Sequence, residues 1–176
     1  LKERRDGKKY LCLYYSGPIR SAGGTASSVS VIIADYIRIR MGYKEYDPTK
    51  EEIKRMSTEL YDYHEKVTNL QYLPSVEEIE FMIGHLPVQI DGDPSEKYEV
   101  SNYKDLKRIA TNIIRNGVCL VVGEGLTQKA PKLWKQLEKW GKDFGLKQWN
   151  FLEKFLKIQK RVKAKEKIGE KKEGII

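Results

Sequence analysis

A predicted strand, a glycine-rich loop and a predicted helix follow one another near the start of the chain, and this order constrains the fold more than any other feature. The apolar run at residues 10–15 is typical of a short, well-buried strand. Residues 16–25 hold three glycines, and Thr25 or Ser27 is expected to be the N-cap of the helix that follows. The inner face of this helix is predicted to be formed by Val29, Ile32, Ile33, Tyr36 and Ile37.

A helix N-terminus after a glycine-rich loop is suited to hold an anion. The first backbone N–H groups of a helix have no acceptor within it, and the helix dipole places partial positive charge there. Arg20 would add a permanently charged, planar donor. Contact with a phosphate or a nucleic-acid backbone is therefore expected at Arg20, Ser21, Gly23, Gly24 and Thr25. The alternative is that the glycines only allow close packing, and the P-loop and dinucleotide-binding patterns are both absent.

Positive charge is concentrated in the C-terminal quarter of the chain. The 176 residues carry a net charge of +8, but residues 129–176 alone carry +9 and the first 128 residues carry −1. This asymmetry favours a surface for a polyanion, although a solvated, flexible end is the alternative. Further phosphate contacts are expected at Arg115, Lys129 and Lys132.

Two helices downstream are predicted to form an αα-hairpin. Residues 47–49 begin a helix with a narrow apolar stripe, and Ser75 caps the next helix after a Pro–Ser turn. Residues 88–100 alternate around an Asp-Gly-Asp-Pro turn, which predicts a β-hairpin. The pattern of residues 101–117 fits a helix or a strand, and the run at residues 118–122 predicts a central, doubly buried strand.

The predicted fold class is therefore α+β: a helical hairpin, a small mixed or antiparallel sheet, the N-terminal strand–glycine loop–helix unit, and a basic helical tail. Residues 1–9 are expected to be frayed, and a helix is expected from Ala130. The lysine-rich end is expected to be frayed or disordered. We accordingly divide the chain into a module of residues 1–156 and a tail of residues 157–176.

No arrangement of residues in the sequence indicates catalysis or a metal site. The aspartates of the pair Asp91 and Asp93 could bind a divalent ion, but in a turn they more often cap the backbone. Cys12 and Cys119 lie in apolar runs and are expected to be reduced core residues of a cytoplasmic protein. No apolar run approaches the roughly 20 residues of a membrane span, so no membrane partner is expected.

Several of these stretches together resemble the N-terminal part of the large subunit of the archaeal D-family DNA polymerase. The resemblance covers about residues 10–150 in collinear order. It is carried by Tyr-Ser-Gly-Pro-Ile-Arg-Ser-Ala-Gly-Gly-Thr at residues 15–25, Leu-Gln-Tyr-Leu-Pro-Ser at 70–75, Pro-Val-Gln-Ile-Asp-Gly-Asp-Pro-Ser-Glu at 87–96 and Lys-Ala-Pro-Lys at 129–132.

The resemblance implies a replicative, template-dependent DNA polymerase, a nucleotidyltransferase that uses a divalent metal such as Mg²⁺. Its partners would be primer–template DNA, a small exonuclease subunit in a heterodimer, and the rest of the large subunit. The family's catalytic aspartates lie further along, and nothing in this chain matches them. We therefore expect a non-catalytic module that supports the catalytic core and contacts the DNA backbone.

Two alternatives stay open beside that expectation. The chain could be a purely structural or subunit-interface module without DNA binding, or a phosphate-ligand-binding enzyme domain. The first residue is Leu rather than Met, from which we expect a piece of a longer protein.

Overall fold

The computed structural model describes the backbone of residues 1–16 and 23–173, with side chains to residue 171. Helices dominate these residues, and the α+β class is confirmed. The α-helices are α1 (Gly23–Met41), α2 (Lys50–Lys66), α3 (Val76–His85), α4 (Asn116–Leu120), α5 (Ala130–Trp140) and α6 (Phe151–Glu173). A π-helix, η2 (Val121–Thr127), and two 3₁₀ helices, η3 (Gly141–Phe144) and η4 (Lys147–Trp149), join the later ones.

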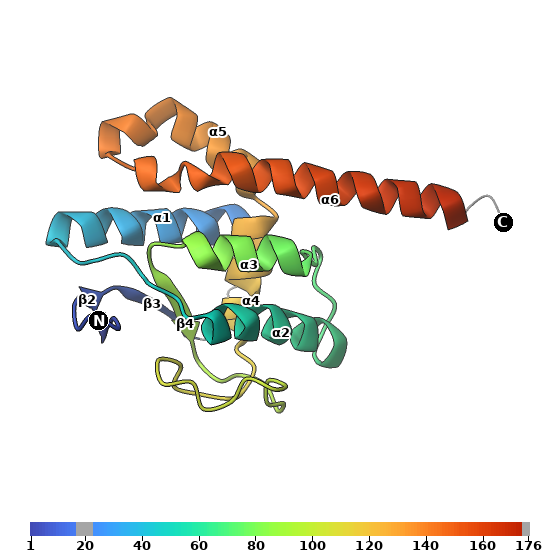
Figure 1. Cartoon of the computed structure of the whole chain (residues 1–176), viewed down its shortest axis with the longest axis horizontal. Coiled ribbons are helices and arrows are strands. Elements are labelled where there is room, and N and C mark those ends of the chain that lie inside the picture. Colours follow the sequence, from blue (N-terminus) through green and yellow to red (C-terminus); the bar gives the residue numbers. More distant parts are fainter. Residues whose placement is uncertain (17–22, 174–176) are drawn as a thin grey trace.

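The helices lie in layers, with α5 and α6 over α1 and α3, and with α2 and the strands beneath (Figure 1). The helical segment formed by α4 and η2 crosses these layers and contacts α1, α2, α3 and α5. Every residue of α4 is buried, and so is every residue of η2 except Glu124. This segment is therefore the centre of the core.

Two small two-stranded sheets hold the N-terminal segment. β1 (Lys2–Glu3) pairs antiparallel with β2 (Lys9–Tyr10). The expectation that residues 1–9 are frayed is therefore wrong for these strands. β3 (Cys12–Tyr15) pairs in parallel with β4 (Gln89–Gly92). The predicted strand is thus present, but its side chains are only half-buried or exposed. One sheet is antiparallel and the other is parallel, so the strands form two separate small sheets and not one mixed or antiparallel sheet.

The β-hairpin predicted at residues 88–100 is wrong. All four residues of β4 are buried, and their partner strand lies more than 70 positions upstream. The residues after β4 form irregular chain, in which Glu99 and Ile113 make a single antiparallel bridge. The partner of β4 is a strand far away in the sequence, so the alternation of nearby residues could not identify the pairing.

The central strand predicted at residues 118–122 is also wrong, because these residues belong to α4 and η2. A short apolar run that is buried on all sides fits a strand or a core helix equally well.

Local capping signals, by contrast, identified the α2–α3 hairpin correctly. Thr49 and Glu52 form a capping box at the start of α2. The Ser75 hydroxyl accepts a hydrogen bond from the Glu78 N–H at the start of α3. Gly42, directly after α1, has the positive φ of 76° that favours glycine.

The inner face predicted for the first helix is only partly correct. Ile32 is buried, but Ile33 and Ile37 are 54% and 46% exposed. The buried face instead includes Asp35, whose carboxylate accepts hydrogen bonds from the side chains of Arg38, Gln148 and Trp149. Polar residues on the inner face and apolar residues on the outer face explain why the hydrophobic pattern was misleading.

The helix α6 begins on the core and then extends beyond the rest of the molecule (Figure 1). Leu152, Phe155 and Gln159 are buried, whereas every residue from Lys163 to Lys171 is exposed. The lysine-rich segment is helical up to Glu173, and the division of the chain at residues 156 and 157 stays a prediction. Within the described residues, no helix combines the length and the apolar character needed to span a bilayer.

Candidate nucleic-acid interface

The first turn of α1 meets η2 and the start of α5 at one close contact. A Cβ atom placed on Gly24 would lie 2.2 Å from the carbonyl oxygen of Glu124 and 3.2 Å from Cε of Lys129. Contacts under about 3 Å do not occur for real Cβ atoms, so glycine is required at this position. The close-packing alternative therefore accounts for Gly24, and the same contact places the stem of Lys129 beside the start of α1.

A second glycine completes the contact from the side of η2. A Cβ atom on Gly125 would lie 2.7 Å from Oγ of Ser27 and 3.5 Å from the carbonyl oxygen of Gly24. Ser27 and Ser28 both donate their hydroxyl hydrogen to that Gly24 carbonyl, at 2.9 Å each. These bonds lie within the first turn of α1, and the close approach of Gly125 packs that turn against η2.

The N-cap predicted at Thr25 or Ser27 is wrong, because α1 already begins at Gly23. Thr25 is exposed in the first turn, and the Ser27 hydroxyl donates rather than accepts as an N-cap would. Gly23 has φ +72°, a backbone conformation that glycine adopts without strain.

Lys129 and Lys132 lie at the start of α5. The Lys129 N–H donates to Gly125 at 2.9 Å, and its carbonyl accepts from the Leu133 N–H at 3.0 Å, so its backbone is fixed. Lys129 is half-buried and Lys132 is exposed, and neither ammonium has an acceptor within residues 1–16 and 23–171. The first turn of α1 has backbone N–H groups without an acceptor in the helix, and the lysines add the positive charge.

Glu124 is the acidic neighbour of this junction. Its carboxylate accepts a hydrogen bond from the backbone N–H of Gln71 at 3.0 Å. The side chain thereby holds the loop between α2 and α3, while its carbonyl contacts α1.

Of the expected phosphate contacts, the structure thus brings Gly23, Gly24, Thr25 and Lys129 to one junction, and Lys132 lies three residues further along the chain in α5. Arg20 and Ser21 lie outside the described residues. The proximity of Lys129 to Gly24 joins positions 105 residues apart, and no spacing in the sequence could have indicated it.

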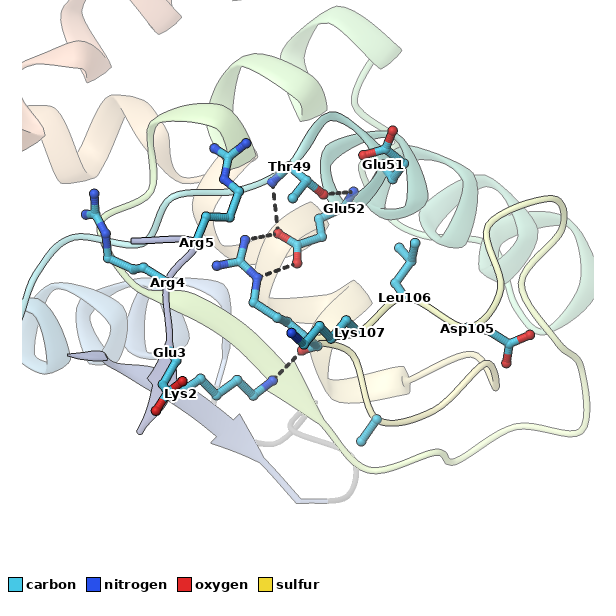
Figure 2. Close-up of a pocket in the computed structure, with 12 residues that line it drawn as sticks. Lys2, Glu3, Arg4, Arg5, Thr49, Glu51, Glu52, Asp105, Leu106 and Lys107 are labelled. Atoms are coloured by element: carbon cyan, nitrogen blue, oxygen red, sulfur yellow. Dashed lines mark hydrogen bonds and ion pairs between the residues drawn. The ribbon is translucent and has the colours of Figure 1, made fainter. Parts of the chain in front are cut away.

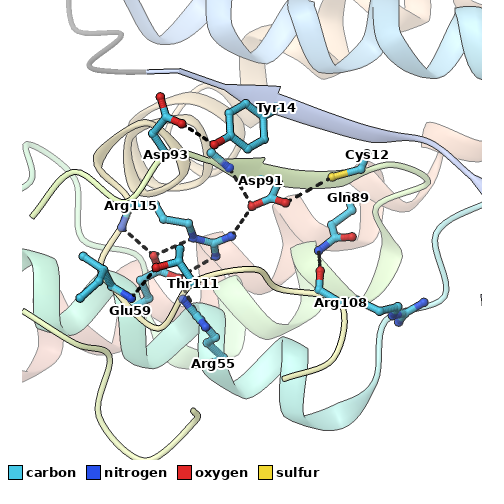
Figure 3. A network of polar contacts seen from close by, with 12 residues as sticks. Cys12, Tyr14, Arg55, Glu59, Gln89, Asp91, Asp93, Arg108, Thr111 and Arg115 are labelled. Atoms are coloured by element: carbon cyan, nitrogen blue, oxygen red, sulfur yellow. Dashed lines mark hydrogen bonds and ion pairs between the residues drawn. The ribbon is translucent and has the colours of Figure 1, made fainter. Parts of the chain in front are cut away.

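Arg115, also expected to contact phosphate, is instead buried in an ion-pair network (Figure 3). Its Nε and Nη2 donate to the two carboxylate oxygens of Glu59 at 3.0 and 2.8 Å, and its Nη1 donates to Asp91 at 2.9 Å. Its side chain is 1% exposed. The guanidinium is therefore not available to a ligand, and its role is to join α2, β4 and the start of α4.

The network shifts the titration of its members. Burial alone would raise the pKa of Glu59 and Asp91, but the neighbouring cations outweigh it and hold both pKa values below the ordinary range. For Glu59 the cation is chiefly Arg115, and for Asp91 it is Lys2, 3.0 Å away, followed by Arg115. Burial likewise opposes the charge of Arg115, yet its two carboxylate partners raise its pKa.

Asp91 and Asp93 do not form a cation site in this arrangement. Asp91 is neutralised by Lys2 and Arg115, and Asp93 accepts a hydrogen bond from the Tyr14 hydroxyl. Across residues 1–16 and 23–171, no three His, Cys, Asp or Glu side chains are grouped so as to hold a metal ion. Cys12 and Cys119 are both free thiols.

A cavity lies away from the α1–α5 junction, between the N-terminal segment, the start of α2 and residues 105–110 (Figure 2). Its volume is about 680 Å³. Its lining holds both basic and acidic side chains, and four of its five cations have carboxylate partners: Arg108 pairs with Glu52, Lys2 with Asp91, Arg4 with Asp6 and Arg5 with Asp47. Mixed, internally neutralised charge does not suit a polyanion, so this cavity is a weaker candidate than the α1–α5 junction.

The chain is similar to one protein family over most of its length. Residues 1–158 match the family described as DNA polymerase II large subunit DP2, N-terminal. A DNA polymerase II large subunit of Nanoarchaeum equitans is 57% identical over 165 residues, and one of Methanothermobacter thermautotrophicus is 45% identical over 168 residues. A third, of Thermococcus kodakarensis, is 40% identical over 164 residues.

These relatives are much longer than the chain. The matches cover 94%, 96% and 93% of this chain, but only 13%, 15% and 9% of the respective relatives. The similarity thus concerns one region of a large subunit.

Proposed function

This chain belongs to the N-terminal family of the archaeal DNA polymerase II large subunit, and from that premise we propose that it is a non-catalytic module that contacts the DNA backbone and supports the catalytic part. The whole subunit would carry out template-directed DNA synthesis in replication, paired with a small exonuclease subunit. The Mg²⁺ implied for that reaction would be held by another part of the large subunit.

The observation that carries the DNA-contact proposal is the position of the Lys129 ammonium, which has no acceptor among the described residues, beside the first turn of α1. Its stem packs 3.2 Å from the Cβ position of Gly24, so the charged end is held near the N-terminal N–H groups of the helix, which have no acceptor within it. A helix N-terminus and a lysine together favour one phosphate oxygen. Lys132, one turn further along α5, would reach a second phosphate.

Such contacts would position the protein without reading sequence. Hydrogen bonds and ion pairs to phosphates fix register and orientation, whereas specificity needs contacts to base edges. We therefore expect affinity for primer–template and duplex DNA of any sequence, as a subunit that follows a growing primer requires.

The test is fluorescence-anisotropy titration of a labelled primer–template with the 176-residue chain and its variants. Lys129→Gln and Lys132→Gln together remove two charges and leave neutral polar side chains in their place. The matched control is Lys135→Gln with Lys139→Gln, which removes two exposed charges from the same helix. We expect the first pair to weaken binding at least about tenfold and the control to weaken it less than about threefold, because ordered phosphate contacts exceed general attraction.

A further variant separates the junction from the projecting helix α6. Lys163→Gln, Lys165→Gln and Lys167→Gln lower the charge of its exposed part. If these three changes abolish binding and the junction pair does not, the DNA contact is lysine electrostatics of α6 and the junction proposal is wrong. Equal loss in the junction pair and its control would also contradict it.

The second candidate function is a purely structural or subunit-interface module. It is favoured by the apolar outer face of α1, where Ile33 and Ile37 are exposed. This function predicts that the chain has no affinity for DNA at low salt, so the same titration distinguishes it.

A further inference from the structure

Large apolar side chains form a stripe along the outer face of α1. Ile33, Ile37 and Met41 follow one another at helical spacing and are 54%, 46% and 60% exposed. Phe144, which is 50% exposed, extends the stripe through an edge-to-face contact with Tyr36 at 5.8 Å between ring centroids. The outer face thus presents branched and aromatic side chains where a surface helix normally carries polar ones.

The opposite face of the same helix is already buried in the core. Val31 and Ile32 are at most 2% exposed, and α1 packs on η2 and α5. The buried face carries Asp35 and Arg38 beside these apolar residues, so α1 has large apolar side chains on both faces, which is typical of a helix buried on both sides. Among the described residues, η2 and α5 cover one of these faces, and the stripe on the other face is exposed.

The chemistry of the stripe favours a permanent protein cover over DNA or a transient partner. Aliphatic side chains give nothing to a phosphate backbone, and the nearby Arg40 guanidinium stacks on the Tyr36 ring, 5.7 Å from its centroid. Permanent interfaces resemble a core cut in half, whereas transient interfaces are more polar.

The length of the relatives indicates which part of the protein packs on the stripe. At least about 85% of each cited large subunit lies outside the region that this chain matches. We infer that, in the intact large subunit, the α1 stripe of Ile33, Ile37 and Met41 is covered by another part of the same polypeptide. This inference rests on the family membership and supports the bracing half of the proposed function, but it does not depend on DNA contact.

The direct test is site-specific photo-cross-linking in a full-length large subunit that contains this region, purified without its small subunit. A benzophenone amino acid replaces Ile37, and in a control it replaces Val76, which is equally exposed (46%) on α3. We expect the Ile37 probe to form links within one polypeptide, to residues beyond those of this chain, with at least about fivefold higher yield than the Val76 probe. Links to a second copy, links only after adding the small subunit, or no links would overturn the inference.

A stability comparison checks that the variants fold. Ile33→Gln with Ile37→Gln should leave the melting temperature of the 176-residue chain unchanged, because both side chains are exposed there. In the full-length subunit the same pair should speed limited proteolysis about tenfold, since two amides would be buried without partners. Equal proteolysis of the variant and the wild-type subunit would contradict the inference.

These outcomes are independent of the DNA titration. Both substitutions are neutral, so the isolated variant chain should bind primer–template DNA as the wild type does. If the lysine variants lose DNA binding but the stripe forms no cross-links within the large subunit, the DNA-contact proposal stands and only this inference is wrong.

Discussion

A single buried arginine ties together three segments that are distant in the sequence. Arg115 donates through its side chain to Glu59 of α2 and to Asp91 of β4, and its backbone N–H donates to Glu59 at 2.9 Å. Asp91 is further held by Lys2 of β1. Arg115, which the sequence predicted to contact phosphate, therefore joins segments inside the core.

Replacing Arg115 by alanine should destabilise the chain by about 3–5 kcal/mol, because Glu59 would stay buried without its main partner. The free energy of unfolding from urea denaturation measures this effect. Lys107→Ala, an exposed basic position nearby in the sequence, is the control and should change stability by less than about 0.5 kcal/mol. An equally small effect for Arg115→Ala would show that the network does not hold the fold.

The same network predicts a loss of stability in acid. Glu59 and Asp91 have folded-state pKa values below their ordinary values of 4.5 and 3.8. Their contribution is therefore fully present above those ordinary values and is lost as pH falls through the lower, folded pKa values. Glu78 acts in the opposite sense, because burial raises its pKa and its contribution is lost as pH rises.

We expect the melting temperature to fall steeply below about pH 4. Asp91→Asn should be less stable at pH 7 and should show a shallower decline in acid, while the exposed Glu51→Gln should follow the wild type. Parallel curves for Asp91→Asn and the wild type would contradict this account.

At the scale of helices and strands, the contact of α1 with η2 depends on two glycines. Gly24→Ala would place a methyl group 2.2 Å from the Glu124 carbonyl oxygen, so one helix must move. The expected cost is about 1–3 kcal/mol of unfolding free energy, typical of overpacking. The control is Gly169→Ala on the exposed part of α6, where no atom lies within 4 Å of the added Cβ and helicity should rise slightly. A neutral Gly24→Ala variant would show that the two helices are not tightly packed.

The elements that sequence predicted correctly are those set by neighbouring residues. Thr49 and Ser75 cap α2 and α3 through side chains only three residues from their partners, so local chemistry was sufficient. The strand expected at residues 118–122 is a core helix, and the expected β-hairpin is a parallel pair, because both depend on tertiary burial. The outward direction of Ile33 likewise depends on the buried polar group of Asp35, which the apolar pattern does not reveal.

For the whole molecule, the collinear motifs identified the family, and that resemblance is confirmed by the match over residues 1–158. The candidate site was only partly predictable. The glycine stretch indicated the start of α1, but its contact with Lys129 exists only in the folded chain. Net charge located the basic C-terminal quarter without separating the lysines at the junction from those on the projecting α6.

The salt dependence of DNA binding is the most direct test of a phosphate contact at the junction of α1 and α5. In the log–log plot of the binding constant against salt concentration, each phosphate contact contributes a slope of about −0.9 for duplex DNA. We predict that Lys129→Gln flattens the slope of the 176-residue chain by about one contact, whereas Lys139→Gln leaves it unchanged. An identical slope for the wild type and Lys129→Gln would contradict a phosphate contact at the junction of α1 and α5.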